Sequence, residues 1–559
     1  MPDRTDGCAS PRPGMRDLTA PRASLLLLRT WWYTVPLVLV ALASFGFSCT
    51  HYSISIDDLA GSRYIAGELL AQRRFTWPLI AHLFGFDNTV PLVMDALGIV
   101  LLTFSTALLS GLFVSVSRGR FTRGAALAFS CVYVSFPLSE ELFVYTAMPL
   151  AVGGCMVLVA LSLTLVDRSF SRRGARSFAC LAGAVACLVL VVGWYESHVV
   201  VFICAVFALL FLANDPSLEL RRQFGRAVGS GFRYAVVLAA GVVLGVGIGV
   251  LVMNVAGIEA SSNAYNALSI VNGQNLVQTM RDFLFAYAGR APFYLPIAVL
   301  DLSVLACLVL IVADAGRHRS PCRALLLVCM VPCLVVMTLL ESLPAPYRTA
   351  QIVPFFVAAV AALVWAHVEG VGRGEPGRAG RALFGAALCV LVCVQVADIN
   401  HWYRVDWERN LAERQIMHEI AADLDERGLA GKPVAFTGDF ILGGTWREDE
   451  FIRSDDPRAA CFADRGLTQV DMTAEFAFSV QETYEYTTWA MQAFGGQDEL
   501  FKYLDVMGCP LIQATPGQLE DARSQAEGIP AWPAPSGIVD RGTYVQVQLG
   551  YTDPRWKAL

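Results

Sequence analysis

Residues 234–256 read Y A V V L A A G V V L G V G I G V L V M N V A, without one charged side chain. A helix that crosses the ~30 Å hydrocarbon core of a bilayer needs about 20 mainly apolar residues. The stretch therefore predicts a transmembrane helix and sets the class of the whole protein. Composition agrees, because 55% of the 559 residues are hydrophobic and only 16% are charged, against about 25% charged in soluble proteins.

Ten further runs of this kind occur along the chain. They lie near residues 31–50, 90–116, 122–138, 145–166, 177–194, 197–213, 292–313, 323–340, 349–368 and 382–398. We therefore expect an all-α polytopic membrane domain over residues 31–398, with about eleven transmembrane helices. Residues 1–30 are basic and are expected to form a cytoplasmic arm ahead of an uncleaved signal anchor.

Arginine in the loops alternates from side to side. If the N-terminus lies inside, the cytoplasmic segments hold twenty-two arginines and the outer loops hold six. An excess of positive charge marks the cytoplasmic face. The sequence thus predicts a multi-pass protein of the cell membrane with its N-terminus in the cytoplasm. The outer face then carries the loop over residues 51–89 and everything after about residue 399.

Ordinary globular patterning begins after Asp398. Residues 407–427 and 485–505 read as helices, and two strands are expected at residues 433–437 and 544–549. Residues 399–559 are therefore expected to form a small extracytoplasmic α/β domain. We interpret it as a lid or a module that docks the acceptor, and an independent catalytic role is the alternative. Its cysteines, Cys461 and Cys509, either pair in an oxidising compartment or remain free thiols. No nucleic-acid-binding motif occurs.

Two adjacent acids, Asp57 and Asp58, stand in the first outer loop, in the stretch I S I D D L A G S R Y. An aspartate before Leu59 can cap a helix that begins there, but a cap needs only one acid. Neighbouring carboxylates push one pKa upward, which suits a general base. We interpret one aspartate as the cap and the other as a catalytic base, with Asp57 as the first choice.

Arginines near these acids favour a phosphate-bearing ligand. A guanidinium group is the preferred partner of phosphate, although arginine at the end of a span also extends to lipid headgroups. The expected contacts of the donor phosphate are Arg63, Arg73, Arg74, Tyr347 and Arg348. For Arg348, at the mouth of the tenth span, an ion pair with Glu341 is the alternative.

Other polar residues stand at the outer ends of the spans, where ionisable groups are functional hypotheses by default. The turn G W Y E S H, residues 193–198, joins two spans with almost no loop, so its side chains must face a cavity or the interface. The side chains expected to line a substrate cavity are Glu68, Trp77, Glu140, Glu141, Tyr195, Glu196 and His198. Among acids inside apolar runs, Asp95 lies near an outer end and only Asp301 lies near the middle.

The order of these features resembles the Gtr type II glucosyltransferases, which modify O-antigen. The words that carry the resemblance are I S I D D L, R R F T W P L I, D N T V P L V M D A L, P L S E E L F, G W Y E S and P Y R T A Q. It implies a GT-C-type membrane fold and transfer of a sugar, usually glucose, from a polyprenyl-phosphate carrier to a cell-surface glycan on the outer face. It also implies a catalytic base in the first outer loop, here Asp57 or Asp58.

The leaving lipid phosphate needs positive charge, which arginines or a divalent metal held by carboxylates can supply. Arginines are our first choice, and no metal site is assigned. A transporter or flippase of lipid-linked glycans is the alternative function, and an envelope-assembly scaffold is a third. A transporter is expected to show polar groups near the midplane and interrupted repeats, neither of which the sequence shows clearly.

Overall fold

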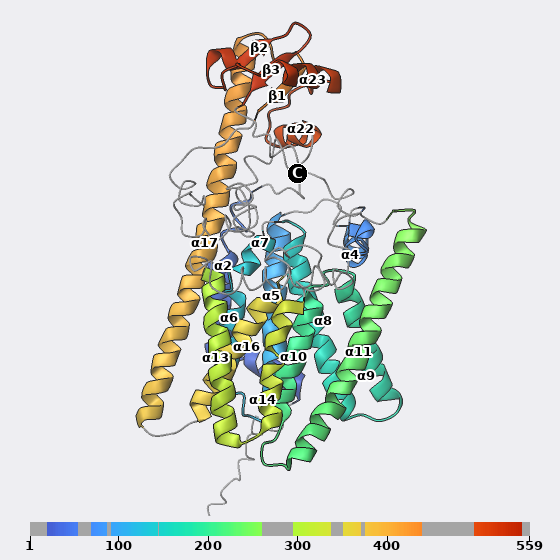
Figure 1. The fold of residues 1–559 in the computed structure, drawn as a ribbon, viewed down its shortest axis with the longest axis vertical. Helices are drawn as coiled ribbons and strands as arrows, with labels where there is room; N and C mark the ends of the chain where they lie inside the picture. The colour runs from blue at the N-terminus through green and yellow to red at the C-terminus, as the bar shows by residue number, and fades with distance from the viewer. Residues whose placement is uncertain are drawn as a thin grey trace, which may run out of the picture.

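The structure, a computed structural model, describes residues 19–53, 67, 69–85, 91–143, 145–259, 295–336, 350–370, 375–438 and 497–549. It is mostly helical, as expected for an all-α membrane protein. A bundle of apolar helices makes up the larger part, and a small C-terminal domain stands at the end of one long helix (Figure 1).

Seven described helices are long and apolar enough to cross a membrane. They are α5 (Pro91–Val116), α8 (Met148–Phe170), α9 (Ala175–Val192), α11 (Leu220–Val255), α13 (Leu295–His318), α16 (Ile352–Gly370) and α17 (Glu375–Glu426). Shorter apolar helices occupy the other expected spans, namely α2 (Trp31–Phe45), α6 (Arg123–Val134), α10 (His198–Ala213), and α14 (Pro321–Val328) with the 3-10 turn η4 (Val331–Val335). Every expected run thus contains a described helix, while the count of eleven spans stays a prediction.

The described chain begins with helix α1 (Ala20–Leu28), which is bent by 76° from α2. One side of α1 packs on α5, where a Cβ on Gly111 would lie 2.1 Å from the Ser24 hydroxyl oxygen. The end of the expected N-terminal arm therefore belongs to the bundle. The reason is a one-sided pattern at helical spacing, because the buried positions are Ala20, Ala23, Ser24 and Leu27.

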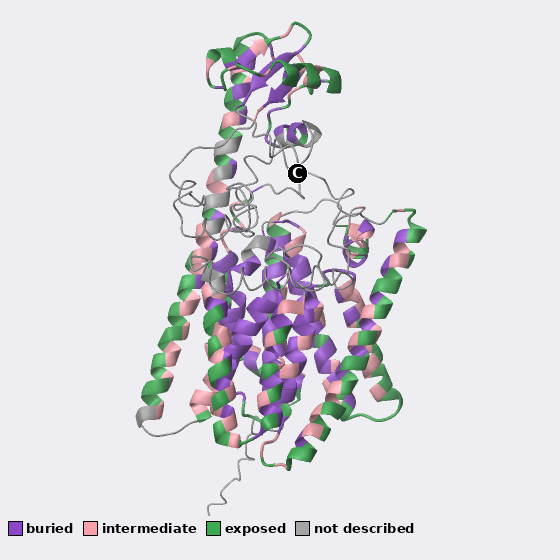
Figure 2. Ribbon diagram, in the orientation of Figure 1, coloured by how far each residue is buried: buried purple, intermediate pink, exposed green. Residues whose placement is uncertain are grey.

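Three helices form the centre of the bundle. In the most apolar part of each helix, 67% of α5, 72% of α8 and 61% of α16 is buried, against 17% of α9 and 11% of α17. Figure 2 shows the buried centre in purple and the exposed rim in green. Large apolar side chains cover the rim, such as Val243 of α11 and Leu383 of α17. Such an outward face is stable in lipid and not in water.

The central helices approach each other closely where their residues are small. A Cβ on Gly98 of α5 would lie 2.5 Å from the Cβ of Pro149 in α8, and a Cβ on Gly153 would lie 2.7 Å from the Gly98 carbonyl oxygen. Lipid tails are as apolar as leucine, so helices in a membrane associate through van der Waals contact of this kind. Gly98 therefore fixes the α5–α8 contact two turns after the start of α5.

Helix α17 is continuous for 52 residues. The expected domain boundary at residues 398/399 falls inside it, as does nearly all of the amphipathic helix expected at residues 407–427. Hydrogen bonds attach α17 to the bundle. Asn400 Nδ2 donates to the Ala43 carbonyl oxygen at 2.7 Å, and the Ser135 hydroxyl donates to Gln395 Oε1 at 2.8 Å. At about 1.5 Å per residue, the helix is ~78 Å long and reaches the C-terminal domain (Figure 1).

The C-terminal domain is built partly from α17 itself. Met417, Ile420 and Leu424 of its last turns enter an apolar cluster with side chains of the sheet and of α22 (Gln497–Val506). The sheet has the order β1–β3–β2, with a parallel β1–β3 pair and an antiparallel β2–β3 pair. Its elements are β1 (Val434–Thr437), β2 (Ile538–Asp540) and β3 (Val545–Gln548), with α23 (Pro516–Ser524) and η6 (Pro535–Gly537) beside them. Both expected strands are confirmed, although β3 is buried along its whole length as the central strand.

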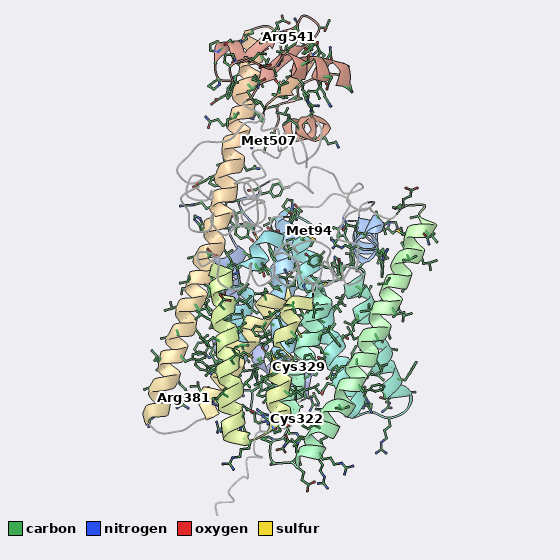
Figure 3. The ribbon with its side chains drawn as sticks, in the orientation of Figure 1. Met94, Cys322, Cys329, Arg381, Met507 and Arg541 are labelled. Carbon is green, nitrogen blue, oxygen red and sulfur yellow. The ribbon has the colours of Figure 1, made fainter. Side chains whose placement is uncertain are left out.

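The bundle has two distinguishable ends. Helices α4 (Thr76–Phe84) and α7 (Leu138–Phe143) lie toward the end that faces the C-terminal domain (Figure 1). In Figure 3, Arg541 and Met507 lie beyond this end, and Cys322 and Arg381 lie at the opposite end. We refer to the first as the loop end and to the second as the arginine end. The arginine end is the face expected in the cytoplasm, and this orientation stays a prediction.

Candidate functional site

The segment Arg73–Thr76 docks on the turn between α9 and α10. The Thr76 amide donates to the Gly193 carbonyl oxygen at 2.7 Å, and its hydroxyl donates to the Leu190 carbonyl oxygen at 2.9 Å. The last carbonyls of a helix have no partner within the helix, so Thr76 completes the end of α9. A Cβ on Gly193 would lie 2.4 Å from the Phe75 ring. The loop can approach this closely only because residue 193 is glycine.

Arg74 and Glu196 form an ion pair at this junction. Arg74 Nη2 lies 2.8 Å from Glu196 Oε1 and Nε lies 3.1 Å from Oε2, which is the two-point geometry that makes such pairs specific. The guanidinium carbon lies 5.2 Å from the centroid of the Tyr195 ring. Burial alone would raise the pKa of Glu196, but the Arg74 charge outweighs it and the pKa is lowered. The carboxylate therefore stays ionised at neutral pH.

Arg73 has a different environment from its neighbour. Its φ of 66° lies in the left-handed region, which non-glycine residues rarely adopt. Its carbonyl oxygen faces Gly249 of α11, where a Cβ would lie only 2.8 Å away. The residue is exposed and forms no ion pair within the described part of the chain. Packing thus holds the backbone of Arg73 while its side chain remains accessible.

The α9–α10 turn buries three polar side chains. In the described structure the Trp194 indole nitrogen, the Ser197 hydroxyl and both ring nitrogens of His198 are without a hydrogen bond. All three residues are at least nine-tenths buried. Buried polar groups of this kind are rare in native proteins because they lose hydration without compensation. Their concentration beside the Arg74–Glu196 pair indicates a site that water or a substrate completes.

A small polar cavity lies at the same end of the bundle. It has a volume of about 20 Å³, is lined by residues of α5 and α7 and by Tyr403 of α17, and has room for one water molecule. Asp95 of α5 faces it and is 4% exposed. The His51 ring, also in the lining, stacks on Phe47 at 4.1 Å and meets Trp407 of α17 edge-on at 4.8 Å. The start of the first outer loop is thereby attached to α17.

The first outer loop is held on both sides of its catalytic candidates. Ser53, which precedes them, lines the Asp95 cavity, and Arg74, which follows them, binds Glu196. The expected site residues that lie outside the described part of the chain are Asp57, Asp58, Arg63, Glu68, Tyr347 and Arg348. Their roles stay predictions.

The other expected site residues, from both the phosphate contacts and the cavity lining, lie in three places. Arg74, Tyr195, Glu196 and His198 come together at the α9–α10 turn. Trp77 instead packs in the apolar core of the bundle and is 4% exposed. Residues 140 and 141, the two expected glutamates, lie in α7, but their side chains are not described.

Sequence reasoning noted Asp95 but missed its neighbours His51 and Tyr403. An acid inside an apolar run was the available signal. No spacing in the sequence indicates that a tyrosine of the last long helix reaches the same cavity. Among the described residues, no cluster of three or more His, Cys, Asp or Glu side chains is arranged to hold a metal ion.

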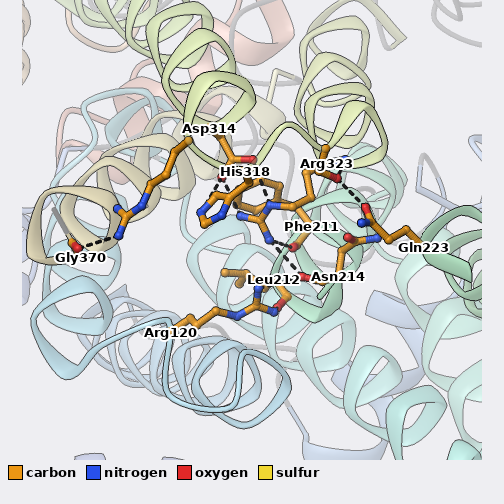
Figure 4. A network of polar contacts seen from close by, with 11 residues as sticks. Arg120, Phe211, Leu212, Asn214, Gln223, Asp314, His318, Arg323 and Gly370 are labelled. Carbon is orange, nitrogen blue, oxygen red and sulfur yellow. Dashed lines mark hydrogen bonds and ion pairs between the residues drawn. The ribbon is translucent and has the colours of Figure 1, made fainter. Parts of the chain in front are cut away.

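A second buried polar network occupies the arginine end (Figure 4). Arg323 contacts both carboxylate oxygens of Asp314 at 2.8 and 2.9 Å and donates to the carbonyl oxygens of Phe211 and Asn214, each at 3.1 Å. Arg120 also donates to the Asn214 carbonyl oxygen, at 2.8 Å. Two guanidinium groups thus complete the carboxyl end of α10, where the helix dipole favours positive charge.

This network corrects the expectation that buried polar residues other than Asp301 gather at the outer ends. The expectation was wrong because an arginine that contributes to the charge of a short basic loop can also be buried, where it donates hydrogen bonds to the carbonyl oxygens at the end of a helix. Arg323 is 6% exposed and Asp314 is 2% exposed, so both belong to the interior. Asp301 itself is exposed in the second turn of α13.

Comparison with known families agrees with this arrangement. The family model described as glucosyl transferase GtrII matches residues 46–365. The chain belongs to this family. The GtrII region runs from the end of α2 into α16, so it includes the first outer loop, the Arg74–Glu196 junction and the network at the arginine end. No curated protein matches the chain.

Membership in the GtrII family confirms the resemblance seen in the sequence. It indicates a glycosyltransferase, and the apolar helices indicate that this enzyme resides in a membrane. Helix α17 and the C-terminal domain lie beyond the matched residues.

Proposed function

We propose that this GtrII member transfers a sugar, glucose by the family's name, from a polyprenyl-phosphate carrier to a cell-surface glycan at the loop end of the bundle. The loop end is then the outer face, as the arginine distribution predicts. The Arg74–Glu196 contact carries the proposal. It fixes the segment Arg73–Thr76, which follows the proposed catalytic acids in the sequence, beside a turn whose buried polar groups lack partners among the described residues.

Chain length limits where the acids can act. Asp57 follows Ser53 by four residues, and Ser53 lines the Asp95 cavity. An extended chain spans at most about 3.6 Å per residue, so four residues reach about 14 Å. The catalytic acid of this proposal therefore works near the loop end of α5.

In the proposed reaction the acceptor hydroxyl attacks the anomeric carbon of the sugar. One aspartate of the pair accepts the hydroxyl proton as the new carbon–oxygen bond forms. The bond between the anomeric carbon and the phosphate oxygen breaks, and the lipid phosphate leaves with the bonding electrons. Positive charge at that oxygen lowers the barrier because negative charge develops there.

The two arginines of the docked segment, Arg73 and Arg74, have different roles in this proposal. Arg74 is bound to Glu196 and positions the loop. Arg73 is exposed and has no ion pair among the described residues, so it is the first candidate for contact with the donor phosphate. Arg63, Tyr347 and Arg348 remain further candidates from the sequence.

A transporter or flippase of lipid-linked glycans is the alternative. Moving a sugar headgroup across the bilayer needs polar groups along the path through the bundle. In the described residues the charged networks lie at the two ends, and α5, α8 and α16 share one apolar core. This arrangement favours chemistry at one face over transport.

The test compares Asp57→Asn and Asp58→Asn with the unaltered full-length protein in lipid nanodiscs. Each sample receives prenyl-phosphate glucose and surface glycan from cells that lack the protein. Glucose in the glycan and free prenyl phosphate are measured. We expect at least one variant to lose both products with unchanged yield and helical content. Full transfer by both variants overturns the assigned base, and carrier translocation without any transfer favours the flippase.

A further inference from the structure

A groove between α10, α11 and α14 lies apart from the candidate site. Its volume is about 380 Å³, within the ~300–1,000 Å³ range of ligand sites. Two of its residues, Cys322 and Cys329, lie in the half of the bundle nearer the arginine end (Figure 3). We refer to it as the lateral groove, with walls that include Val206, Leu210, Val228, Gly231, Cys322 and Leu325.

The lateral groove is apolar and opens sideways. None of the described side chains that line it is charged. Val228 at its edge is 68% exposed and Leu325 is 49% exposed. In a bilayer this opening faces hydrocarbon, so the matching occupant is an extended hydrocarbon chain and not a polar solute.

Polar contacts at the arginine end connect the three walls. The Ser320 hydroxyl, just before α14, donates to Gln223 Oε1 of α11. Asn214 Nδ2, at the end of α10, lies 3.4 Å from Cys322 Sγ. Arg323 adds its hydrogen bonds to the carboxyl end of α10. Because these contacts bind α14 to both neighbours, the groove is a fixed feature of the fold.

Two arginines adjoin the groove-lining residues in the sequence, toward the arginine end. On α11, Val228 and Gly231 lie on the stripe that lines the groove, and Arg221 continues that stripe toward the arginine end at helical spacing. Arg319 stands three residues before Cys322. Both arginines are exposed, and neither forms an ion pair within the described residues. Exposed arginines that adjoin an apolar groove in the sequence of two of its walls match a phosphate headgroup with an attached hydrocarbon chain.

We propose that the lateral groove binds an anionic phospholipid of the leaflet at the arginine end. One acyl chain lies between α10, α11 and α14, and the headgroup phosphate contacts Arg221 and Arg319. The site is separate from the sugar-transfer site and does not depend on the proposed reaction. The bound lipid stabilises the packing of α14 against α10.

The test uses full-length protein in nanodiscs of phosphatidylglycerol and phosphatidylcholine, followed by native mass spectrometry of the lipids that stay bound. Gly231→Leu fills the groove, because a Cβ at this position meets only Leu210 Cδ1, at an ordinary contact distance of 3.5 Å. Gly229→Leu is the matched control on the same helix, since a Cβ there meets nothing within 4 Å. Arg221→Gln and Arg319→Gln test the headgroup contacts.

We expect the unaltered protein and Gly229→Leu to retain phosphatidylglycerol in preference to phosphatidylcholine. Gly231→Leu should lose both lipids, and each arginine variant should lower the preference about fivefold. The proposal is overturned if Gly231→Leu retains as much phosphatidylglycerol as Gly229→Leu, or if both arginine variants keep the preference. Displacement of the lipid by an equal amount of neutral prenol also overturns it, because the groove then selects a prenyl chain.

Discussion

Arg74 and Glu196 are 122 positions apart in the sequence and meet in a two-point contact at 2.8 and 3.1 Å. The pair joins the first outer loop to the α9–α10 turn, next to the backbone contacts of Thr76. The segment Arg73–Thr76 is thereby fixed at a defined place at the loop end of the bundle. Catalysis depends on such placement, because misplaced reacting groups lose much of the rate gained from proximity.

Removing either partner of this pair should weaken both stability and transfer. Arg74→Gln, Glu196→Gln and the double variant form a cycle that isolates their coupling. The Glu196 side chain is 47% exposed, so we expect a coupling of only about 0.5–1 kcal/mol in the free energy of unfolding. Transfer should fall more strongly than stability, because the loop loses its position. Arg73→Gln is the control: it should leave the coupling unchanged and weaken use of the donor.

The same pair predicts a dependence of stability on pH. The folded protein holds the pKa of Glu196 below its ordinary value, which is about 4.3 in a free chain. The stabilisation is therefore complete above that value and is lost as the pH falls through the lower, folded-state pKa. Thermal unfolding of the unaltered protein and of Glu196→Gln should differ at pH 7 and converge in strong acid. A difference that persists unchanged through the acid range would contradict the assignment.

Two neighbouring glycines of α11 provide a matched test of the docked loop. A Cβ at Gly249 would lie 2.8 Å from the Arg73 carbonyl oxygen, whereas a Cβ at Gly247 meets nothing within 4 Å. Both alanine variants gain the same helix propensity. Gly249→Ala should therefore be less stable than Gly247→Ala by about 1–3 kcal/mol and should lose transfer activity. Equal unfolding temperatures and equal activities would show that Arg73 does not depend on this contact.

The buried pair at the arginine end should be sensitive to single substitutions. Asp314→Asn or Arg323→Gln leaves one charge without its partner, which costs about 3–5 kcal/mol in the free energy of unfolding. The double variant should lose less free energy of unfolding than the two single variants lose together, because neither buried charge remains. Arg222→Gln is the control, since Arg222 is 71% exposed and lies 3.8 Å from Glu219. If Asp314→Asn lowers the free energy of unfolding no more than Arg222→Gln does, a structural role for the network is excluded.

Cys509 of the C-terminal domain is a free, buried thiol whose Sγ lies 3.0 Å from His418 Nδ1. Burial raises the pKa of this thiol, so little reactive thiolate forms at neutral pH. We expect iodoacetamide to modify Cys509 slowly in the native protein and rapidly after denaturation, as followed by peptide mass spectrometry. Recovery of a peptide disulfide-linked to Cys461 would contradict a free thiol at position 509.

The sequence predicted the helices of the bundle because hydropathy reports directly on burial in lipid. It did not predict that α17 continues past Asp398. Hydropathy falls there, but the backbone remains helical because extending an existing helix requires no new nucleation. The fall in hydropathy therefore indicates a change in the surroundings of the helix and not the end of the helix.

Contacts between residues that are far apart in the sequence could not be predicted from it, for a different reason. Glu196 was expected in a cavity and Arg74 at a phosphate, yet nothing in either local pattern indicates that they bind each other. For Arg323 the sequence indicated only a positive charge that supports the positive-inside rule. In the structure its buried side chain also donates hydrogen bonds to helix carbonyl oxygens. Local pattern defines where a charge lies along the membrane normal, whereas its partner depends on how the helices pack.

The continuity of α17 also has a mechanical consequence. The helix contacts α2 and α6 at one level and contributes Met417, Ile420 and Leu424 to the core of the C-terminal domain at another. The last turns of α17 and the C-terminal domain therefore share one apolar core. Because the domain stands at the far end of a helix ~78 Å long, a change in the tilt of α17 would displace the domain more than it displaces the part of α17 that contacts α2.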